Sequence, residues 1–433
     1  MARIKKNHLQ VHLNLNVRGL APSATLAINE QSNKLIREGK KVFKLGLGQS
    51  PFPVPETVVE ALRQNAYQKD YLPVRGLPAL KEAVASFNQR TQRIDSDPED
   101  ILIGPGSKEL IFILQLVYYG DIVIPTPSWV SYSPQARIVG RHVNWVPTGA
   151  ENDYRLSPEK LDLICRTDPE RPRVVILNYP SNPTGCTYPI ERLKLLAHVA
   201  RKYQLILVSD EIYGLIHHNG QHVSVAHYYP EGTIISSGLS KWCGAGGWRL
   251  GTFSFPPNLK WLLNAMAIVA SETYTATSAP IQHAAITAFN GNEEIDEYLM
   301  HSRKVLKGIA KYLVKKLEDM GMIVPHPQGA FYLFPNFENY REKLKAKGIY
   351  TSVELSARLL QETGVAMLPG ADFGRQPEEL TARLAYVDFD GRAALEAAEK
   401  NNEDKHFDKA MVKEVCPRLV EAFDRIGNWL ADL

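Results

Sequence analysis

Residues 205–213 read L-I-L-V-S-D-E-I-Y and residues 233–241 read T-I-I-S-S-G-L-S-K, so each segment begins with an apolar run and ends in polar groups. Similar runs recur between about residues 95 and 290, and amphipathic stretches such as residues 190–203 separate them. Short apolar runs bounded by turn residues, with helical segments between them, are typical of a mostly parallel sheet covered by helices. The sequence therefore predicts an α/β fold with its ligand site at the carboxyl ends of the strands.

The pattern changes in the C-terminal third. A long helical stretch near residues 293–320 precedes short strands such as A-F-Y-L-F-P at 330–335 and T-A-R-L-A-Y-V at 381–387, with charged helices between and after them. This pattern is typical of a smaller α+β lobe. We expect a large domain of residues 50–295 and a small domain of residues 1–49 and 296–433, which includes an N-terminal arm. The charged stretch 399–413 is expected to be a solvated helix or loop.

Composition limits the classes of partner. The chain has 50 Lys+Arg against 47 Asp+Glu, and this net charge of +3 is too small and too dispersed to indicate a nucleic acid or a membrane surface. The four cysteines are far apart with no C-x-x-C spacing, which argues against zinc and against a disulfide framework. The N-terminus never reaches the apolar stretch of a signal peptide. We therefore expect a small-molecule ligand and a reducing, cytoplasmic location.

Lys241 lies in the small-residue loop S-S-G-L-S-K-W-C-G-A-G-G-W-R-L-G at 236–251, directly after an apolar strand. Arg249 follows in a glycine-rich turn that would let the backbone approach a phosphate group. A lysine in this setting is a candidate for Schiff base formation with pyridoxal phosphate. A surface lysine in a turn is the alternative interpretation of the segment.

Polar groups follow two other predicted strands. Asp210 closes an apolar strand, so its carboxylate needs a cationic partner, and a protonated pyridine nitrogen would serve. A helix N-cap is the alternative role for Asp210. A turn of helix after Asp210 would return the Tyr213 hydroxyl to the same site, and Asn178 and Asn182 follow the neighbouring strand. A phenol and an amide near the cofactor's 3-oxygen would hold that oxygen anionic, although each residue alone suits an ordinary turn.

Several motifs occur together in a characteristic order. They are S-N-P-T-G at 181–185, S-D-E-I-Y at 209–213, L-S-K at 239–241 and G-W-R-L-G at 247–251. This set resembles the class I/II aminotransferases of the fold type I pyridoxal-phosphate superfamily. Further segments resemble the branch that includes bacterial aspartate and aspartate/prephenate aminotransferases: A-P-S-A-T-L-A-I-N at 21–29, L-G-L-G-Q-S-P-F-P-V-P at 45–55, D-Y-L-P-V-R-G-L-P-A-L at 70–80 and G-P-G-S-K-E-L at 104–110. The resemblance extends from about residue 22 to residue 387.

The resemblance implies a large domain with a mostly parallel seven-stranded sheet, a smaller α+β domain, pyridoxal phosphate as cofactor and a homodimer with shared sites. It implies that Lys241 carries the cofactor and shuttles protons, that Asp210 pairs with the pyridine nitrogen, and that Asn182 and Tyr213 donate to the 3-oxygen. The implied phosphate and ring contacts are Arg249, Gly106, Ser107, Lys108, Trp129 and, from the other subunit, Tyr71. The implied substrate contacts are Arg383 for the α-carboxylate, with Gly48, Asn182, Trp129 and Lys108.

The chain departs from the family pattern at three places. Gly238 stands where many members of the superfamily have a phosphate-binding serine, so we expect Ser237 or Ser240 to supply that hydroxyl. Gln49 stands where many relatives of the branch have glutamate, and V-D-F-D-G at 387–391 replaces small residues after Arg383. Both departures concern the choice of substrate.

The predicted reaction is transamination between an L-amino acid and a 2-oxo acid by ping-pong kinetics. Lys108 favours aspartate or glutamate as one partner, whereas Trp129, Phe331 and Tyr332 would suit aromatic substrates if they formed an apolar wall and not part of the core. A pyridoxal-phosphate-dependent lyase for β-elimination is the alternative, because the cofactor stabilises the same carbanion for both reactions. A non-catalytic regulator that binds the cofactor is a remote alternative.

Overall fold

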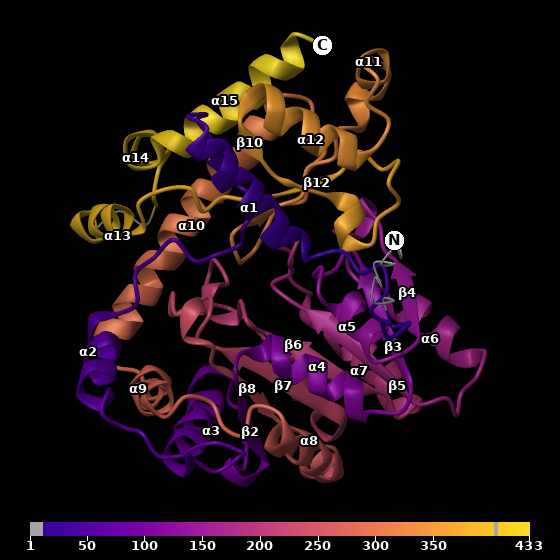
Figure 1. The fold of residues 1–433 in the computed structure, drawn as a ribbon, viewed down its shortest axis with the longest axis vertical. Helices are drawn as coiled ribbons and strands as arrows, with labels where there is room; N and C mark the ends of the chain where they lie inside the picture. Colours follow the sequence, from indigo (N-terminus) through magenta and orange to yellow (C-terminus); the bar gives the residue numbers. More distant parts are fainter. Residues whose placement is uncertain (1–11, 402–405) are drawn as a thin grey trace, which may run out of the picture.

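The computed structural model describes residues 12–401 and 406–433. A seven-stranded sheet with its covering helices forms one part of the molecule, and the C-terminal third packs above the sheet together with α1 (Figure 1). The strands of the large sheet are β2 (Ile101–Gly104), β3 (Asp121–Thr126), β4 (Val143–Pro147), β5 (Arg173–Asn178), β6 (Ile206–Asp210), β7 (Thr233–Gly238) and β8 (Gly251–Ser254).

The order across the large sheet is β2-β8-β7-β6-β5-β3-β4. All neighbouring pairs are parallel except those of β8, which is antiparallel to both β2 and β7. In register, Asn178 pairs with Asp210, and Asp210 pairs with Ser236. The carboxyl ends of β5, β6 and β7 therefore meet at one edge, and polar side chains from three separate segments gather there.

Both faces of the large sheet are covered, which explains its nearly continuous apolar strands. Alternate residues of β5 face opposite sides: Val174 and Ile176 join one buried cluster, whereas Val175 and Leu177 join another. The helices of this part of the chain are α2 (Glu56–Asn65), α3 (Pro78–Gln92), α4 (Ser107–Val117), α5 (Tyr132–Ile138), α6 (Pro158–Arg166), α7 (Ile190–Lys202), α8 (Lys260–Glu272) and α9 (Ala279–Asn290). Helices α4, α5 and α8 contribute to the first cluster, and α6 and α7 contribute to the second.

The C-terminal third builds two small sheets. In one, β1 (Phe43–Lys44) is parallel to β10 (Val365–Ala366), and in the other, β12 (Ala382–Ala385) lies between β11 (Leu368–Pro369) and β9 (Tyr332–Leu333). The pairing of β1 with β10 brings the segment near residue 45 to this part of the molecule. The helices around these sheets are α1 (Ala24–Arg37), α10 (Glu293–Asp319), α11 (Arg341–Ala346), α12 (Ser352–Thr363), α13 (Gly391–Lys400), α14 (Lys409–Val415) and α15 (Pro417–Ala431).

The α/β class and the mostly parallel seven-stranded sheet are confirmed. The helix expected directly after Asp210 is wrong: the chain makes a tight turn there and then the 3-10 helix at Gly214–Ile216. The division into domains at residues 50 and 295 stays a prediction, and residues 1–11 of the expected N-terminal arm lie outside the described residues. All four cysteines are buried and free. None of the helices in the described part of the chain has the length and apolarity needed to cross a membrane.

Candidate active site

A pocket of about 580 Å³ lies where the carboxyl edge of the large sheet faces the C-terminal third. The expected site residues that line it are Gly48, Ser107, Lys108, Trp129, Asn182, Asp210, Tyr213, Ser240, Lys241, Arg249 and Arg383. The start of α1 also lines the pocket through Ser23, Thr25 and Leu26, which we did not predict as ligand contacts. The structure thus brings together most of the residues chosen from motifs that are far apart in the chain.

Lys241 enters the pocket from the loop that follows β7. Its Nζ donates a hydrogen bond of 2.6 Å to the backbone carbonyl of Gly48. Burial, reinforced by the positive charges of Arg383 and Arg249, lowers the pKa of Lys241 to about 8. About a tenth of this amine is therefore neutral at pH 7, far more than for an exposed lysine, and the neutral form is the nucleophile that a Schiff base requires.

Asp210 ends β6 with its side chain buried, and burial raises the pKa of its carboxyl to about 6. The hydroxyl of Tyr132 donates a hydrogen bond of 2.5 Å to Oδ2 of Asp210, and this bond favours the carboxylate. Tyr132 begins α5 and contacts the ring of Trp129 edge to face. We did not predict this role, although Tyr132 is three residues from Trp129 in the segment T-P-S-W-V-S-Y.

Arg383 lies on β12 with only 1% of its surface exposed. It donates to Oδ1 of Asn182 at 3.1 Å and to the carbonyl of Gly46, and its guanidinium lies against the rings of Tyr332 and Phe373. Its Nε has no hydrogen-bond partner, and among the described residues no carboxylate lies within ion-pair distance. A buried guanidinium without an anionic partner is costly, so this residue is suited to bind a carboxylate ligand.

The start of α4 and Arg249 form a second anion-binding end of the pocket. Ser107 is the first residue of α4, and no side chain caps this helix end, so its first N–H groups can bind an anion. Gly106 has φ of 94°, and a Cβ there would lie 2.2 Å from Nη2 of Arg249. Arg249 donates to the carbonyls of Gly246 and Pro105, which hold its guanidinium beside the helix start.

Lys108 and Trp129 lie together at the open side of the pocket. Nζ of Lys108 is 5.2 Å from the centre of the Trp129 ring, and Lys108 forms no ion pair with a described residue. Tyr332 also lines the pocket, whereas Phe331 is fully buried and does not. The apolar wall that would suit aromatic substrates is therefore only partly formed, because Phe331 belongs to the core.

Three of the expected ligand contacts do not line the pocket. Gly106 lies just behind Ser107, and Ser237 lies within β7, paired with Thr252 of β8. Tyr71 is 91% exposed and lies in the segment between α2 and α3, so any contact it makes with a cofactor must be in another subunit.

The structure explains why position 238 is glycine. A Cβ there would lie 2.6 Å from the carbonyl of Leu250, so β7 and β8 pair too closely for serine. Of the two serines considered as replacements, only Ser240 faces the pocket.

Comparison with known proteins identifies the family. The family model for aminotransferases of class I and II matches residues 40–388. This chain belongs to that family. The aminotransferase is 36% identical over 381 residues to the aspartate aminotransferase of Geobacillus stearothermophilus, an alignment that covers 86% of this chain and 93% of the relative. It is 32% identical over 366 residues to the aspartate/prephenate aminotransferase of Thermus thermophilus, with 83% and 91% covered.

A solved structure agrees with this assignment. The aspartate aminotransferase from Thermus thermophilus with maleate superposes on the aminotransferase with a TM-score of 0.79 and 31% identity, covering 89% of this chain and 98% of that one. The resemblance noted in the sequence is thus confirmed, and so is the fold type I architecture. The comparisons give no support to a lyase or to a non-catalytic regulator.

Members of this family use pyridoxal phosphate, and the pocket of the aminotransferase suits this cofactor. The buried Asp210 matches a pyridinium nitrogen, which would supply the cation that its carboxylate lacks. The uncapped start of α4 with Arg249 matches a phosphate group, and the partly neutral amine of Lys241 matches an aldehyde. The protein is therefore a pyridoxal-phosphate-dependent aminotransferase.

Proposed function

We propose that this aminotransferase acts on a dicarboxylic L-amino acid, aspartate or glutamate, and passes the amino group to a 2-oxo acid. The charges of the pocket support this proposal. Lys108, Lys241, Arg249 and Arg383 line it, and Asp210 is the one carboxylate among the lining residues. A cofactor phosphate would occupy Arg249, and a substrate α-carboxylate would occupy Arg383. Lys108 then remains without an anionic partner, and the distal carboxylate of a dicarboxylic substrate would bind it.

Each residue has a role in this proposal. Pyridoxal phosphate supplies the aldehyde that takes up the amino group and the ring that stabilises a carbanion at the substrate Cα. Lys241 would hold the cofactor covalently, and its free amine would move the proton from the substrate Cα. Asp210 would stabilise the charge on the pyridine nitrogen, and Asn182 and Tyr213 would donate to the 3-oxygen. Arg383 would bind the α-carboxylate, and the Trp129 ring would pack on the cofactor.

Relatives support the same substrate class. The similar proteins from Geobacillus stearothermophilus and Thermus thermophilus are named as aspartate and aspartate/prephenate aminotransferases. The structure from Thermus thermophilus contains maleate, which is itself a dicarboxylate. The observation that carries the proposal for this chain is the unpaired Lys108 beside Trp129.

Steady-state kinetics with 2-oxoglutarate test the substrate class. We expect aspartate to give a higher kcat/KM than alanine or phenylalanine in the wild type. Lys108→Gln should lower kcat/KM for aspartate by about 10- to 100-fold, because an ionic hydrogen bond is worth about 1.5–3 kcal/mol, and should leave alanine unchanged. Lys347→Gln, at an exposed lysine that does not line the pocket, is the matched control. Equal losses for aspartate and alanine, or a preference for phenylalanine, would contradict the proposal.

The proposal includes a homodimer whose two subunits share each site. Tyr71 and Tyr67 support it, because they are 91% and 74% exposed and present large aromatic surfaces near the segment that the resemblance assigns to a neighbouring subunit. Co-expression of Lys241→Ala and Tyr71→Ala chains gives a direct test. If Tyr71 acts across the interface, the mixed dimer contains one intact site and recovers about half the wild-type activity per dimer. No recovery would place Tyr71 in its own subunit.

Two further expectations belong to this proposal. The site lies between the predicted large domain of residues 50–295 and the predicted small domain, and limited proteolysis with and without substrate would test that division. A cytoplasmic location is supported by the four cysteines, which are buried and form no disulfide, because disulfides are rare in reducing compartments. Cell fractionation would test it.

A further inference from the structure

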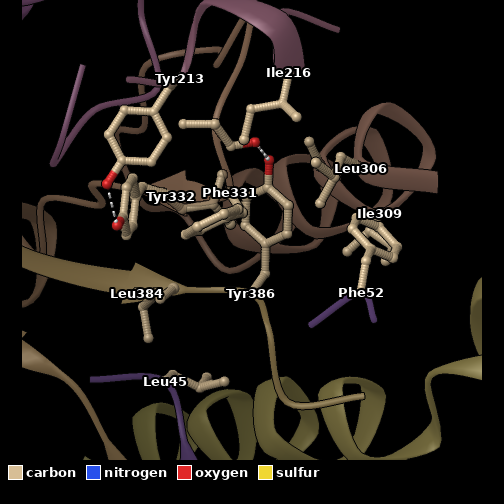
Figure 2. Packing of buried hydrophobic residues seen from close by; sticks show 14 of the residues in the cluster. Leu45, Phe52, Tyr213, Ile216, Leu306, Ile309, Phe331, Tyr332, Leu384 and Tyr386 are labelled. Atoms are coloured by element: carbon tan, nitrogen blue, oxygen red, sulfur yellow. Dashed lines mark hydrogen bonds between the residues drawn. The ribbon is translucent and has the colours of Figure 1, made fainter. Parts of the chain in front are cut away.

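Tyr213 and Tyr332 form a buried pair of phenols at the pocket. Tyr213 follows β6 and Tyr332 lies on β9, and their side chains are 3% and 1% exposed. The two hydroxyl oxygens are 2.7 Å apart and hydrogen-bonded, as the dashed line in Figure 2 shows. Both residues line the pocket, so this bond joins the large sheet to the C-terminal third at the site itself. The resemblance assigned a role to Tyr213 and none to Tyr332.

The protons of this pair can be counted. Each phenol has one hydroxyl hydrogen, and one of the two hydrogens forms the bond between them. Within the described residues, neither hydroxyl has another hydrogen-bond partner. One hydroxyl hydrogen therefore has no acceptor among the described residues, and a ligand or a water in the pocket must accept it. The direction of the bond decides which tyrosine presents that hydrogen.

The surrounding charges set the direction. The guanidinium carbon of Arg383 is 4.8 Å from the centre of the Tyr332 ring. Burial raises the pKa of both phenols. After burial, the largest influence on Tyr332 is Arg383, which lowers its pKa, whereas the largest influence on Tyr213 is Tyr332, which raises its pKa further. The more acidic phenol is the better donor, so Tyr332 donates and Tyr213 accepts.

We propose that Tyr332 is a positioning residue whose hydroxyl donates to Tyr213 and thereby directs the Tyr213 hydrogen into the pocket, toward the 3-oxygen of the bound cofactor. The inference rests on the proposed role of Tyr213. A hydrogen bond received by Tyr213 polarises its own O–H and makes it a stronger donor, since bonded chains of hydroxyls are cooperative. A stronger donor stabilises the anionic 3-oxygen and lowers the proton affinity of the cofactor group that titrates in the visible spectrum.

The packing leaves Tyr332 little freedom to act otherwise. A Cβ on Gly48 would lie 2.0 Å from the Tyr332 hydroxyl, so the backbone of Gly48 lies directly against it. On the other side, Tyr213, Phe331 and Tyr332 contact one another through their rings (Figure 2). The hydroxyl is therefore held in one place. Nζ of Lys241 donates to the carbonyl of the same Gly48 and lies 5.7 Å from the centre of the Tyr213 ring.

The test measures the pH midpoint of the visible band of the protein with bound pyridoxal phosphate, in the wild type, Tyr213→Phe, Tyr332→Phe and the double variant. We expect Tyr332→Phe to raise the midpoint by about 0.5–1 pH unit, a three- to tenfold gain in proton affinity, because a neutral hydrogen bond has this order of strength. Tyr213→Phe should raise it more. In the Tyr213→Phe background, the Tyr332 substitution should add nothing, because its effect passes through Tyr213.

Tyr386→Phe is the matched control. Tyr386 is also fully buried, it does not line the pocket, and its hydroxyl donates to the carbonyl of Ala330. Its loss should leave the midpoint unchanged. Tyr332→Phe keeps the ring beside Arg383, so the dissociation constant of maleate, used as a dicarboxylate probe, should change less than about twofold.

The outcomes separate the possibilities. An unchanged midpoint in Tyr332→Phe, or the same shift with and without the Tyr213 hydroxyl, overturns the inference. A shift in the Tyr386→Phe control assigns the effect to general packing and also overturns it. Failure of the proposed function has a different signature, because the wild type would then show no visible band with pyridoxal phosphate, or no change of that band with any amino acid.

Discussion

The rim of the large sheet forms one wall of the pocket, and β9, β12 and the segment after β1 form the opposite wall. On the rim, strand register fixes the side chains, since Asn178 and Asp210 are paired residues at the ends of neighbouring strands. On the opposite wall, Arg383 is held by individual contacts, including the carbonyl of Gly46 at a separation of 337 residues. The regular backbone thus places the proposed cofactor contacts, and side-chain contacts between distant segments place the proposed substrate contacts.

This difference predicts two classes of variant. Changes on the rim should alter cofactor affinity and chemistry, whereas changes on the opposite wall should alter substrate affinity, apart from Tyr332, whose hydroxyl acts through Tyr213 of the rim. Lys241 is an exception to this division, because its loop belongs to the rim but its amine bonds to the carbonyl of Gly48 and feels the charge of Arg383. The following variants test how sharp the division is.

The largest effect is expected from Lys241→Ala. Removing the amine takes away both the covalent attachment and the group that moves the Cα proton, so kcat should fall by about 10³- to 10⁴-fold. Single-turnover absorbance changes with aspartate measure the loss. Because Arg383 is untouched, the dissociation constant of maleate should stay within a few-fold of the wild-type value. Lys347→Ala is the control, and more than a tenth of wild-type kcat in Lys241→Ala would assign the proton transfer to another residue.

Arg383→Lys tests the opposite wall. Lysine keeps the positive charge but loses the planar fork that grips a carboxylate, so kcat/KM for amino acids should fall by about 100-fold. The affinity for pyridoxal phosphate, measured by fluorescence quenching, should not change. A comparable loss of cofactor affinity would show that the two walls do not act separately.

The sequence predicted the rim better than the opposite wall, for a physical reason. Apolar runs that end in polar residues are sufficient to place Asn178 and Asp210 together, because parallel strands present their carboxyl ends at one edge. No comparable local rule joins Gly46, Tyr332 and Arg383. Only the motif resemblance pointed to Arg383, and Tyr332 in A-F-Y-L-F could not be told from a core residue by its pattern.

Two details of the rim could not be predicted from the sequence. The bond from Tyr132 to Asp210 joins the start of α5 to the end of β6, and a tyrosine in a turn gives no sign of its partner. The glycine at position 238 looked like a missing phosphate ligand, but the close pairing of β7 with β8 explains it. Motifs thus gave the identity of most pocket residues, and they gave neither the hydrogen-bond partners nor the close backbone approaches.

Tyr132→Phe tests the rim without touching a residue that the resemblance identifies. Loss of the bond should raise the pKa of Asp210 above its value of about 6, so less of the carboxylate is available at pH 7 to pair with the pyridine nitrogen. Affinity for pyridoxal phosphate should fall about two- to tenfold at pH 7 and less at pH 8.5, where the carboxyl is mostly ionised in both proteins. Tyr188→Phe, which removes a hydroxyl bonded to the N–H of Leu156, is the control. A defect that does not depend on pH would contradict this explanation.

The smallest expected effect concerns the link between the walls. With a pKa of about 8, the cofactor-free Lys241 is mostly protonated below that pH and neutral above it, so its rate of acetylation by acetic anhydride should rise through a midpoint near pH 8. Exposed lysines should reach their midpoint above pH 10. Arg383→Gln removes a positive charge that disfavours the ammonium form, so the midpoint of Lys241 should move to higher pH. The midpoint should stay below that of an exposed lysine, because burial is the larger cause of the lowered pKa and remains. Mass spectrometry of the labelled peptide measures both midpoints. If the substitution left the midpoint of Lys241 in place, the substrate wall would have no electrostatic influence on the amine, and the two walls would be independent in charge as well as in construction.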